Sequence, residues 1–308
     1  MTASCLTCLR PVPDAKKHHA RCARRLFGTD VAPSLDLRQS EIQTVALATI
    51  GRSSLAGVQP KISVGLHTER RTLQLETNGG RFILKPPTGE FEALPENEHL
   101  TMELARRFGL TVPDTTLIEL RDGTLAYLIA RYDRPITGGK LRQEDFCQLL
   151  LLPPASKYDG TALDCASVIR QFSAEPLADL FRLFETFVFA FWVANGDMHL
   201  KNLSLVADAE GRHLLSPAYD QVCTALYPGL DARLGLPLAP EDRKTDRATW
   251  LRFARALDIP ERAAIRVLNR PASRFRVATT VIAQSYLPDR LRARYSHVLA
   301  TRAEALAE

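Results

Sequence analysis

The stretch Asn195-Gly196-Asp197-Met198-His199-Leu200-Lys201-Asn202 decides how this chain is interpreted. It follows residues 177–193, a strongly apolar segment with the length of a buried helix. It precedes residues 203–206, whose composition is typical of a β-strand. The stretch is therefore predicted to be a loop at the end of two regular elements, where reactive side chains are usually displayed.

Asp197 and Asn202 lie five positions apart in this loop. Protein kinases space the base aspartate and the magnesium-binding asparagine of their catalytic loop by the same interval. A carboxylate accepts the proton of an attacking hydroxyl, and an amide oxygen suits Mg²⁺. Asp220 follows a predicted hairpin, where a kinase carries a second metal-binding carboxylate. Each aspartate alone is also consistent with a helix or turn cap, whereas the three residues together favour phosphoryl transfer.

Lys85 is the candidate for binding ATP in the first half of the chain. It ends a predicted strand, residues 81–84, between apolar neighbours. A buried ammonium requires a partner, which ATP phosphates or a helix glutamate such as Glu98 would provide. The alternative is a strand-edge lysine whose amine lies in water. The loop of residues 53–61 contains small residues and a lysine, which suit phosphate, but it matches no standard glycine-rich motif.

The order of predicted elements indicates an α+β protein with two lobes. Residues up to 134 are rich in strands with one amphipathic helix over 96–108, whereas later residues are mainly helical. The predicted later helices are 143–151, 164–172, 177–193 and further helices from 246 onward. We expect a small Cys/His module at 1–28, a β-rich N-lobe at 29–134 and a helical C-lobe at 135–308.

Composition narrows the class of protein. The 308 residues are 45% apolar and 24% charged, with a net charge of +5, as in a globular protein with a mixed surface. No basic run with interleaved aromatic residues indicates direct nucleic-acid binding. Residues 1–9 lack the features of a secretory signal, and the apolar segment 186–194 is too short to cross a bilayer. We therefore expect a soluble, cytoplasmic protein without membrane contact.

The sequence resembles the HipA-type serine/threonine kinases, which are toxins of bacterial toxin–antitoxin systems. Matching segments occur in family order over about residues 50–230. They are Ser54-Leu55-Ala56-Gly57-Val58-Gln59-Pro60-Lys61, Phe82-Ile83-Leu84-Lys85-Pro86, Glu96-Asn97-Glu98, Ala130-Arg131-Tyr132-Asp133-Arg134, Gln143-Glu144-Asp145-Phe146-Cys147-Gln148, Lys157-Tyr158, Asp197-Met198-His199-Leu200-Lys201-Asn202 and Pro217-Ala218-Tyr219-Asp220.

The resemblance implies a bilobal, protein-kinase-like fold and a role for each matching residue. Asp197 is implied as the catalytic base, Asn202 and Asp220 as Mg²⁺ ligands, and Lys85 as a ligand of the ATP phosphates. The remaining nucleotide contacts are implied for Ala56, Gly57, Val58, Gln59, Lys61, Ala130, Tyr132 and His199. The family phosphorylates a protein, in known cases an aminoacyl-tRNA synthetase, and so stalls translation.

The resemblance also implies autophosphorylation and a particular kind of partner. The family modifies a serine of the phosphate loop, which here is Ser54, with Ser53 as the neighbouring alternative. The phosphate loop begins near residue 53, without room for the extra N-terminal subdomain of long members. The chain therefore looks like the short HipT-type toxins, in which a separate small protein resembles that subdomain. Antitoxin proteins are the implied partners, and DNA is reached only through them.

Four metal-ligand side chains lie within the first 22 residues. Cys5 and Cys8 form a C-x-x-C pair, and His19 and Cys22 form an H-x-x-C pair, with His18 as an alternative to His19. Thiolates and imidazole at such short spacings suit a tetrahedral, structural Zn²⁺. The alternative is a disordered reduced tail.

Two other functions share these features. A nucleotide-binding regulatory subunit of a toxin–antitoxin complex would need no protein kinase activity. A small-molecule kinase would use the same site. The complete set of Lys85, Asp197, Asn202 and Asp220 favours an active enzyme.

Overall fold

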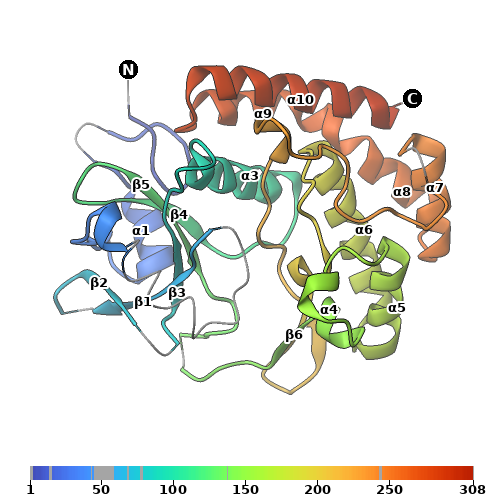
Figure 1. Cartoon of the computed structure of the whole chain (residues 1–308), viewed down its shortest axis with the longest axis horizontal. Helices are drawn as coiled ribbons and strands as arrows, with labels where there is room; N and C mark the ends of the chain where they lie inside the picture. Colours follow the sequence, from blue (N-terminus) through green and yellow to red (C-terminus); the bar gives the residue numbers. More distant parts are fainter. Residues whose placement is uncertain are drawn as a thin grey trace. The chain divides into compact units, whose positions relative to one another are not determined.

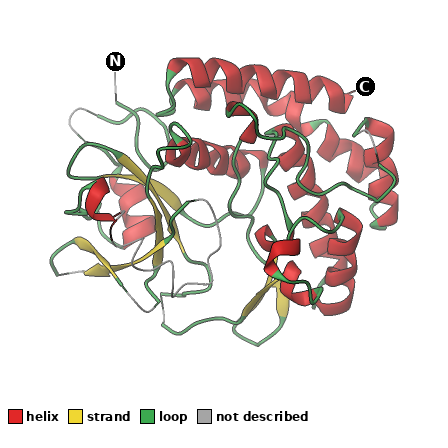
Figure 2. Cartoon of the chain, in the orientation of Figure 1, coloured by secondary structure: helices red, strands yellow, loops and turns green. Residues whose placement is uncertain are grey.

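The computed structural model describes residues 3–307, apart from 14–15, 43, 45–58, 68, 77–78, 137 and 243–244. The chain forms two compact units. The first contains Met1–Glu103, Pro113–Gly139 and Ala283–Pro288, and the second contains Leu104–Val112, Lys140–Ile282 and Asp289–Glu308. Strands predominate in the first unit and helices in the second (Figure 2).

A five-stranded antiparallel sheet is the framework of the first unit (Figure 1). Its strands are β1 (Ile62–His67), β2 (Thr72–Leu75), β3 (Phe82–Lys85), β4 (Thr115–Glu119) and β5 (Leu125–Ala130), in the order β2-β1-β3-β5-β4. The turn between β4 and β5 contains Gly123 at φ 82°, a left-handed conformation that favours glycine. The hairpin predicted at this turn is present.

The helices described here in the first unit include α1 (Ala20–Phe27) and the first part of α3 (Leu94–Phe108). Leu26 and Phe27 of α1 are buried in the same hydrophobic cluster as Phe82 and Leu84 of β3. Helix α1 ends at Gly28, whose φ of 77° and N–H bond to the Arg24 carbonyl are typical of a helix C-terminus. The segment that carries the Cys/His residues thus shares the core of the sheet.

The second unit has a small sheet and most of the helices. Strands β6 (Gln143–Asp145), β7 (Ser204–Ala207) and β8 (His213–Leu215) are antiparallel, in the order β6-β7-β8. The helices are α4 (Phe146–Leu149), α5 (Ala162–Phe172), α6 (Pro176–Trp192), α7 (Arg247–Ala256), α8 (Glu261–Leu268), α9 (Arg270–Ala283) and α10 (Asp289–Ala307). Short 3₁₀ turns cover Pro154–Ser156, Leu200–Asn202 and Thr224–Leu226.

The prediction of a helix over residues 143–151 is wrong at both ends. Gln143–Asp145 forms β6 and pairs with Ser204–Val206 of β7, so a strand partner distant in sequence overrides the local helical pattern. The helix that remains, α4, begins after Asp145. The Asp145 side chain accepts from the Gln148 N–H, and the Gln148 side chain accepts from the Asp145 N–H, a reciprocal capping box.

Helix α6 is the central helix of the second unit. Its buried aromatic residues contact rings of α3 and α7. Phe189 contacts Phe108 of α3, and Phe184 and Phe187 contact Trp250 and Phe253 of α7, respectively. Trp192 is also buried. The Trp192 Nε1–H donates to the Leu299 carbonyl of α10 at 3.1 Å. Because α6 is held on several sides, its C-terminal end is a rigid support for the loop at residues 195–202.

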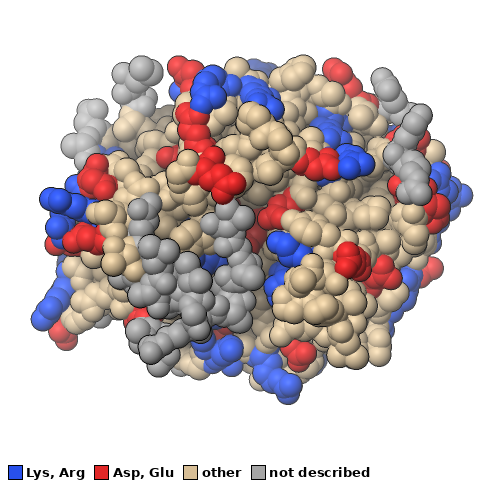
Figure 3. All heavy atoms as spheres, viewed as in Figure 1, with Lys and Arg blue, Asp and Glu red and all other residues tan. Residues whose placement is uncertain are grey.

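The described surface has a mixed charge. On the face drawn in Figure 3, basic and acidic side chains are interspersed among the described residues. None of the described helices combines the length and apolar character needed to cross a membrane.

Candidate active site

The loop at residues 195–202 is supported by buried hydrogen bonds of its own unit. The Asn195 side chain accepts from the Asp197 N–H at 3.1 Å and donates to Gln221 Oε1 at 3.2 Å. The Gly196 N–H donates to Thr224 Oγ1 at 2.9 Å. Asn195 and Gln221 are fully buried, so these bonds form where water does not compete. The backbone on both sides of Asp197 is therefore fixed.

Asp197 and Asn202 face different environments although they share the loop. The Asp197 side chain is 47% exposed, whereas Asn202 as a residue is 5% exposed. Asn202 Nδ2–H donates to the Asp197 carbonyl at 2.8 Å, which closes the loop across its five-residue span. This bond uses the amide nitrogen of Asn202. The amide oxygen is the end that can ligate a cation, and this bond does not involve it.

His199 lies beside the Asp197 carboxylate, with Nε2 3.8 Å from Oδ1. Burial lowers the pKa of His199, and the nearby Asp197 and Asp220 carboxylates oppose this shift. Its Nδ1 is buried and has no hydrogen-bond partner among the described residues. A buried ring nitrogen without a partner costs free energy unless a bound molecule contacts it. The imidazole is therefore a candidate contact for a ligand.

Tyr158 is a site residue for which the sequence predicted no role. Its hydroxyl donates to Asp197 Oδ1, and its ring packs edge-on against His199 with centroids 5.2 Å apart. The Lys157 ammonium lies 5.0 Å from the centre of the Tyr158 ring. Burial and the hydrogen bond to Asp197 raise the pKa of Tyr158. Only the matching Lys157-Tyr158 segment signalled this residue, because 39 positions separate it from Asp197.

Asp220 follows β8 in a left-handed conformation, φ 52°, which is rare for a residue with a side chain. Several bonds hold the segment before it. The Ala218 N–H donates to the Thr111 carbonyl at 2.8 Å, and the Tyr219 hydroxyl donates to the Lys201 carbonyl at 3.0 Å. Strained backbone that surrounding bonds maintain is common at functional sites. The Asp220 carboxylate is close enough to His199 to affect its pKa.

Two glycines allow a second segment to pack directly on the loop. A Cβ on Gly196 would lie 2.1 Å from the Asp231 carbonyl oxygen, and a Cβ on Gly235 would lie 2.6 Å from the Met198 carbonyl oxygen. Neither distance is possible for a real side chain without movement of the backbone. Residues 231–235 thus cover the back of the loop only because both positions are glycine.

In the first unit, Lys85 is paired with Glu98. Lys85 Nζ lies 2.5 Å from Glu98 Oε1, and both side chains are 5% exposed. The ammonium also lies 5.6 Å from the centre of the Tyr127 ring, which is the cross-strand neighbour of Lys85 on β5. A helix glutamate is one of the two partners that the sequence suggested. The alternative of an amine in water does not hold, because the side chain is buried.

The other nucleotide contacts predicted in the first unit are only partly visible. The predicted contacts Ala56, Gly57 and Val58 lie outside the described residues, as do the predicted autophosphorylation sites Ser53 and Ser54. Gln59 donates through Nε2 to the Pro86 carbonyl at 2.9 Å, and Lys61 immediately precedes β1.

The nucleotide contacts predicted at Ala130 and Tyr132 lie in a segment whose backbone already makes hydrogen bonds. The Ala130 N–H donates to the Asp114 carbonyl at 2.8 Å, and the Arg131 N–H donates to the Arg81 carbonyl at 2.9 Å. Tyr132 follows directly after these bonds. A nucleotide contact at this segment would therefore have to use groups other than these two amides.

Comparison with solved structures identifies the fold. The chain is similar to HipA of Shewanella oneidensis, solved with HipB and its operator DNA, with a TM-score of 0.69, 21% identity, and coverage of 87% of this chain and 70% of that one. It is also similar to the proinflammatory kinase CtkA of Helicobacter pylori, with a TM-score of 0.54, 16% identity, and coverage of 76% and 87%. The fold is thus α+β and protein-kinase-like, as the sequence predicts.

The family follows from sequence comparison. The HipA-like C-terminal domain model matches residues 53–279, and this chain belongs to that family. It is 33% identical over 216 residues to "Putative kinase Y4mE" of Sinorhizobium fredii, covering 66% of this chain and 50% of the relative. It is 28% identical over 221 residues to a "Putative kinase" of Haemophilus influenzae, covering 67% and 63%. The chain thus spans about half the length of the first of these relatives.

Proposed function

We propose that this chain is a serine/threonine protein kinase toxin that transfers the γ-phosphate of ATP to a protein. The observation that carries the proposal is the closed loop in which Asn202 Nδ2–H bonds to the Asp197 carbonyl at 2.8 Å. This arrangement holds a half-exposed carboxylate and a buried amide at a fixed separation. Phosphoryl transfer depends on such positioning, because the reaction requires little covalent chemistry from the protein.

Each residue of the set has a role in this proposal. Asp197 accepts the proton of the substrate hydroxyl, and Tyr158 holds its carboxylate through a hydrogen bond. Asn202 and Asp220 supply oxygen donors, which fit Mg²⁺ because this cation prefers hard oxygen ligands. Bound Mg²⁺ would neutralise charge on the ATP phosphates. Lys85, held by Glu98, binds the ATP phosphates.

The regulation, substrate and partners of the kinase are part of the same proposal. Autophosphorylation at Ser54, or at Ser53, would add nearly two negative charges to the phosphate loop and repel ATP. An aminoacyl-tRNA synthetase is the proposed substrate, which places the activity in the cytoplasm. Antitoxin proteins, including a separate small protein that resembles the extra N-terminal subdomain of long family members, are the proposed partners. The HipA–HipB–operator complex of Shewanella oneidensis supports this partnership by similarity of fold.

Transfer of labelled γ-phosphate to proteins of a cell extract tests the proposal. Asp197→Asn should reduce transfer at least ~10²-fold, because it removes the general base but keeps the size of the side chain. Asp289→Asn, at a side chain 92% exposed at the start of α10, is the control and should transfer as wild type does. ATP binding without transfer to any protein would favour the regulatory-subunit alternative. Label found only on small molecules would favour a small-molecule kinase.

A further inference from the structure

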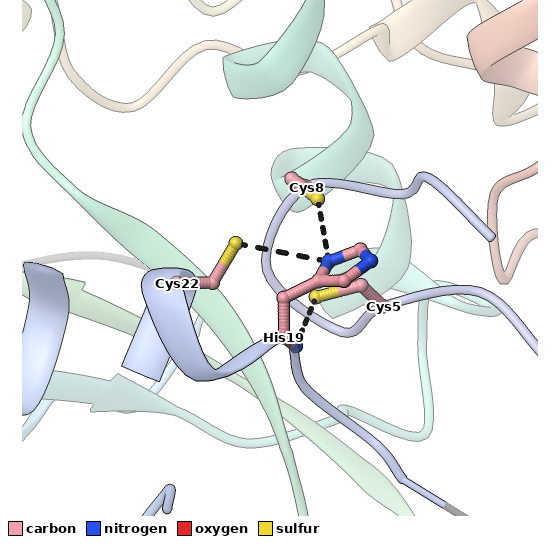
Figure 4. A group of neighbouring side chains, drawn as sticks. All are labelled: Cys5, Cys8, His19 and Cys22. Atoms are coloured by element: carbon pink, nitrogen blue, oxygen red, sulfur yellow. Dashed lines mark hydrogen bonds between the residues drawn. The ribbon is translucent and has the colours of Figure 1, made fainter. Parts of the chain in front are cut away.

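Three cysteines and one histidine of the first unit converge on one point (Figure 4). The ligand atoms of Cys5, Cys8, His19 and Cys22 all lie within 4.8 Å of one another. Cys5 and Cys8 come from one loop, His19 immediately precedes α1, and Cys22 lies in its first turn. Cys5 and Cys22 are buried, and none of the three cysteines forms a disulfide with another described residue. No part of the proposed kinase mechanism uses this cluster.

The separations within the cluster match the dimensions of a tetrahedral zinc site. Zinc bonds of about 2.3 Å to sulfur and 2.0–2.1 Å to nitrogen place sulfur and nitrogen ligands ~3.6 Å apart in a tetrahedron. His19 Nδ1 lies 3.4 Å from Cys8 Sγ and 4.0 Å from Cys22 Sγ. Four protein ligands leave no open position, so the site suits a structural ion.

Contacts around the cluster select His19 and its ligating nitrogen. His19 Nε2 lies 2.9 Å from the Pro11 carbonyl, so Nε2–H donates there and the Nδ1 lone pair is left for a metal. The His19 backbone N–H donates to Cys5 Sγ at 3.4 Å. His18, the alternative from the sequence, instead places Nδ1 3.0 Å from Thr7 Oγ1. Leu9, after Cys8, is held at φ 58°, a strained conformation that a bound ion would help to maintain.

We propose that Cys5, Cys8, His19 and Cys22 bind one Zn²⁺, and that the ion fixes the loop that holds α3 and β4 in position. The loop residues between the two cysteines make the contacts. Leu6 accepts through its carbonyl from the Leu117 N–H of β4 at 2.9 Å, and Thr7 Oγ1 lies 2.9 Å from Thr116 Oγ1. Both Leu6 and Thr7 are buried.

The contact with α3 connects the cluster to the buried ion pair. His99 Nε2–H of α3 donates to the Thr7 carbonyl at 3.1 Å. The preceding residue on the helix is Glu98, the partner of Lys85. In kinases the corresponding lysine–glutamate pair forms only when its helix is correctly positioned. Loss of zinc should therefore loosen the first part of α3 and the Lys85–Glu98 pair. An effect of this loosening on phosphate transfer rests on the proposed kinase function, whereas zinc binding does not.

Metal content of the full-length, tag-free chain tests the site. Elemental analysis should find one zinc per chain in wild type, and none in Cys8→Ser or His19→Ala. His18→Ala and Cys165→Ser are matched controls that should retain the zinc, because neither residue belongs to the cluster. The assignment would be overturned if folded wild type contained no zinc. It would also be overturned if the site contained iron in place of zinc. Co²⁺ substitution of wild type, read by thiolate-to-cobalt absorption, tests the ligands without requiring any variant to fold.

Hydrogen exchange of wild type before and after zinc removal tests the link to α3. Amides of α3 up to residue 103 and of β4 should lose protection, while those of α10 keep it. Unchanged protection in α3, or an equal loss in α10, would overturn the specific link. Phosphate transfer by the zinc-free chain should fall in parallel. If no sample transfers phosphate, the proposed kinase function fails, and the zinc and exchange results still decide this inference.

Discussion

The buried ion pair between Lys85 and Glu98 allows a quantitative test of the first unit. We expect Glu98→Ala to destabilise the chain by roughly 3–5 kcal/mol, because it removes the Glu98 carboxylate from its bond to a buried ammonium. The estimate applies because both side chains are only 5% exposed and Nζ lies 2.5 Å from Oε1. The nearby Tyr127 ring, 5.6 Å from Nζ, compensates for only a small part of this loss.

A second ion pair in the same unit is a matched control. Lys17 Nζ and Glu119 Oε2 are also 2.5 Å apart, but their side chains are 58% and 36% exposed. Solvent screens this pair, so Glu119→Ala should cost at most ~1 kcal/mol. Equal bond lengths with unequal burial isolate the effect of the surroundings.

Urea unfolding, monitored by circular dichroism, measures the free energy of unfolding of Glu98→Ala and Glu119→Ala. The double variant Lys85→Met, Glu98→Leu should recover most of the stability lost in Glu98→Ala, because apolar side chains of similar size often replace a buried pair at little cost. The reasoning is refuted if Glu98→Ala and Glu119→Ala cost the same. It is also refuted if the double variant is as unstable as Glu98→Ala.

Three further predictions concern single residues. Burial raises the pKa of Glu96 from 4.5 to about 7. Wild type should therefore lose stability relative to Glu96→Gln as the pH rises from 5 to 8, and the loss in free energy of unfolding should approach ~3 kcal/mol. Equal pH dependence of the two chains in urea unfolding would contradict this. Gly235→Ala should cost ~1–3 kcal/mol, because its Cβ would meet the Met198 carbonyl oxygen at 2.6 Å, whereas Gly89→Ala, which meets nothing within 4 Å, should show no such loss in the same experiment. Tyr158→Phe should lower the rate of phosphate transfer at saturating ATP about 10-fold, because a hydrogen bond to the loop carboxylate is lost, with thermal stability nearly unchanged; an unaltered rate would exclude a positioning role.

Elements that depend on neighbouring residues could be predicted from the residues alone. Asp197 and Asn202, five positions apart, also lie close together in the structure because one short loop contains both residues. The period-two pattern of β1 and the helical pattern of α3 were likewise readable, because burial of one face imposes the period on the sequence. Family membership rests on motifs of this kind in a particular order.

Contacts between segments that are distant in the chain could be found only from the folded structure. Strand β6 is a strand because β7, about 60 residues later, supplies its hydrogen bonds. Tyr158 reaches Asp197 through the packing of loops, for which no spacing rule exists. His19, and not His18, points into the cysteine cluster because the Pro11 carbonyl orients its ring. In each case the path of the backbone brings the contact partner close in space. The residues next to each position in sequence do not indicate which partner that is.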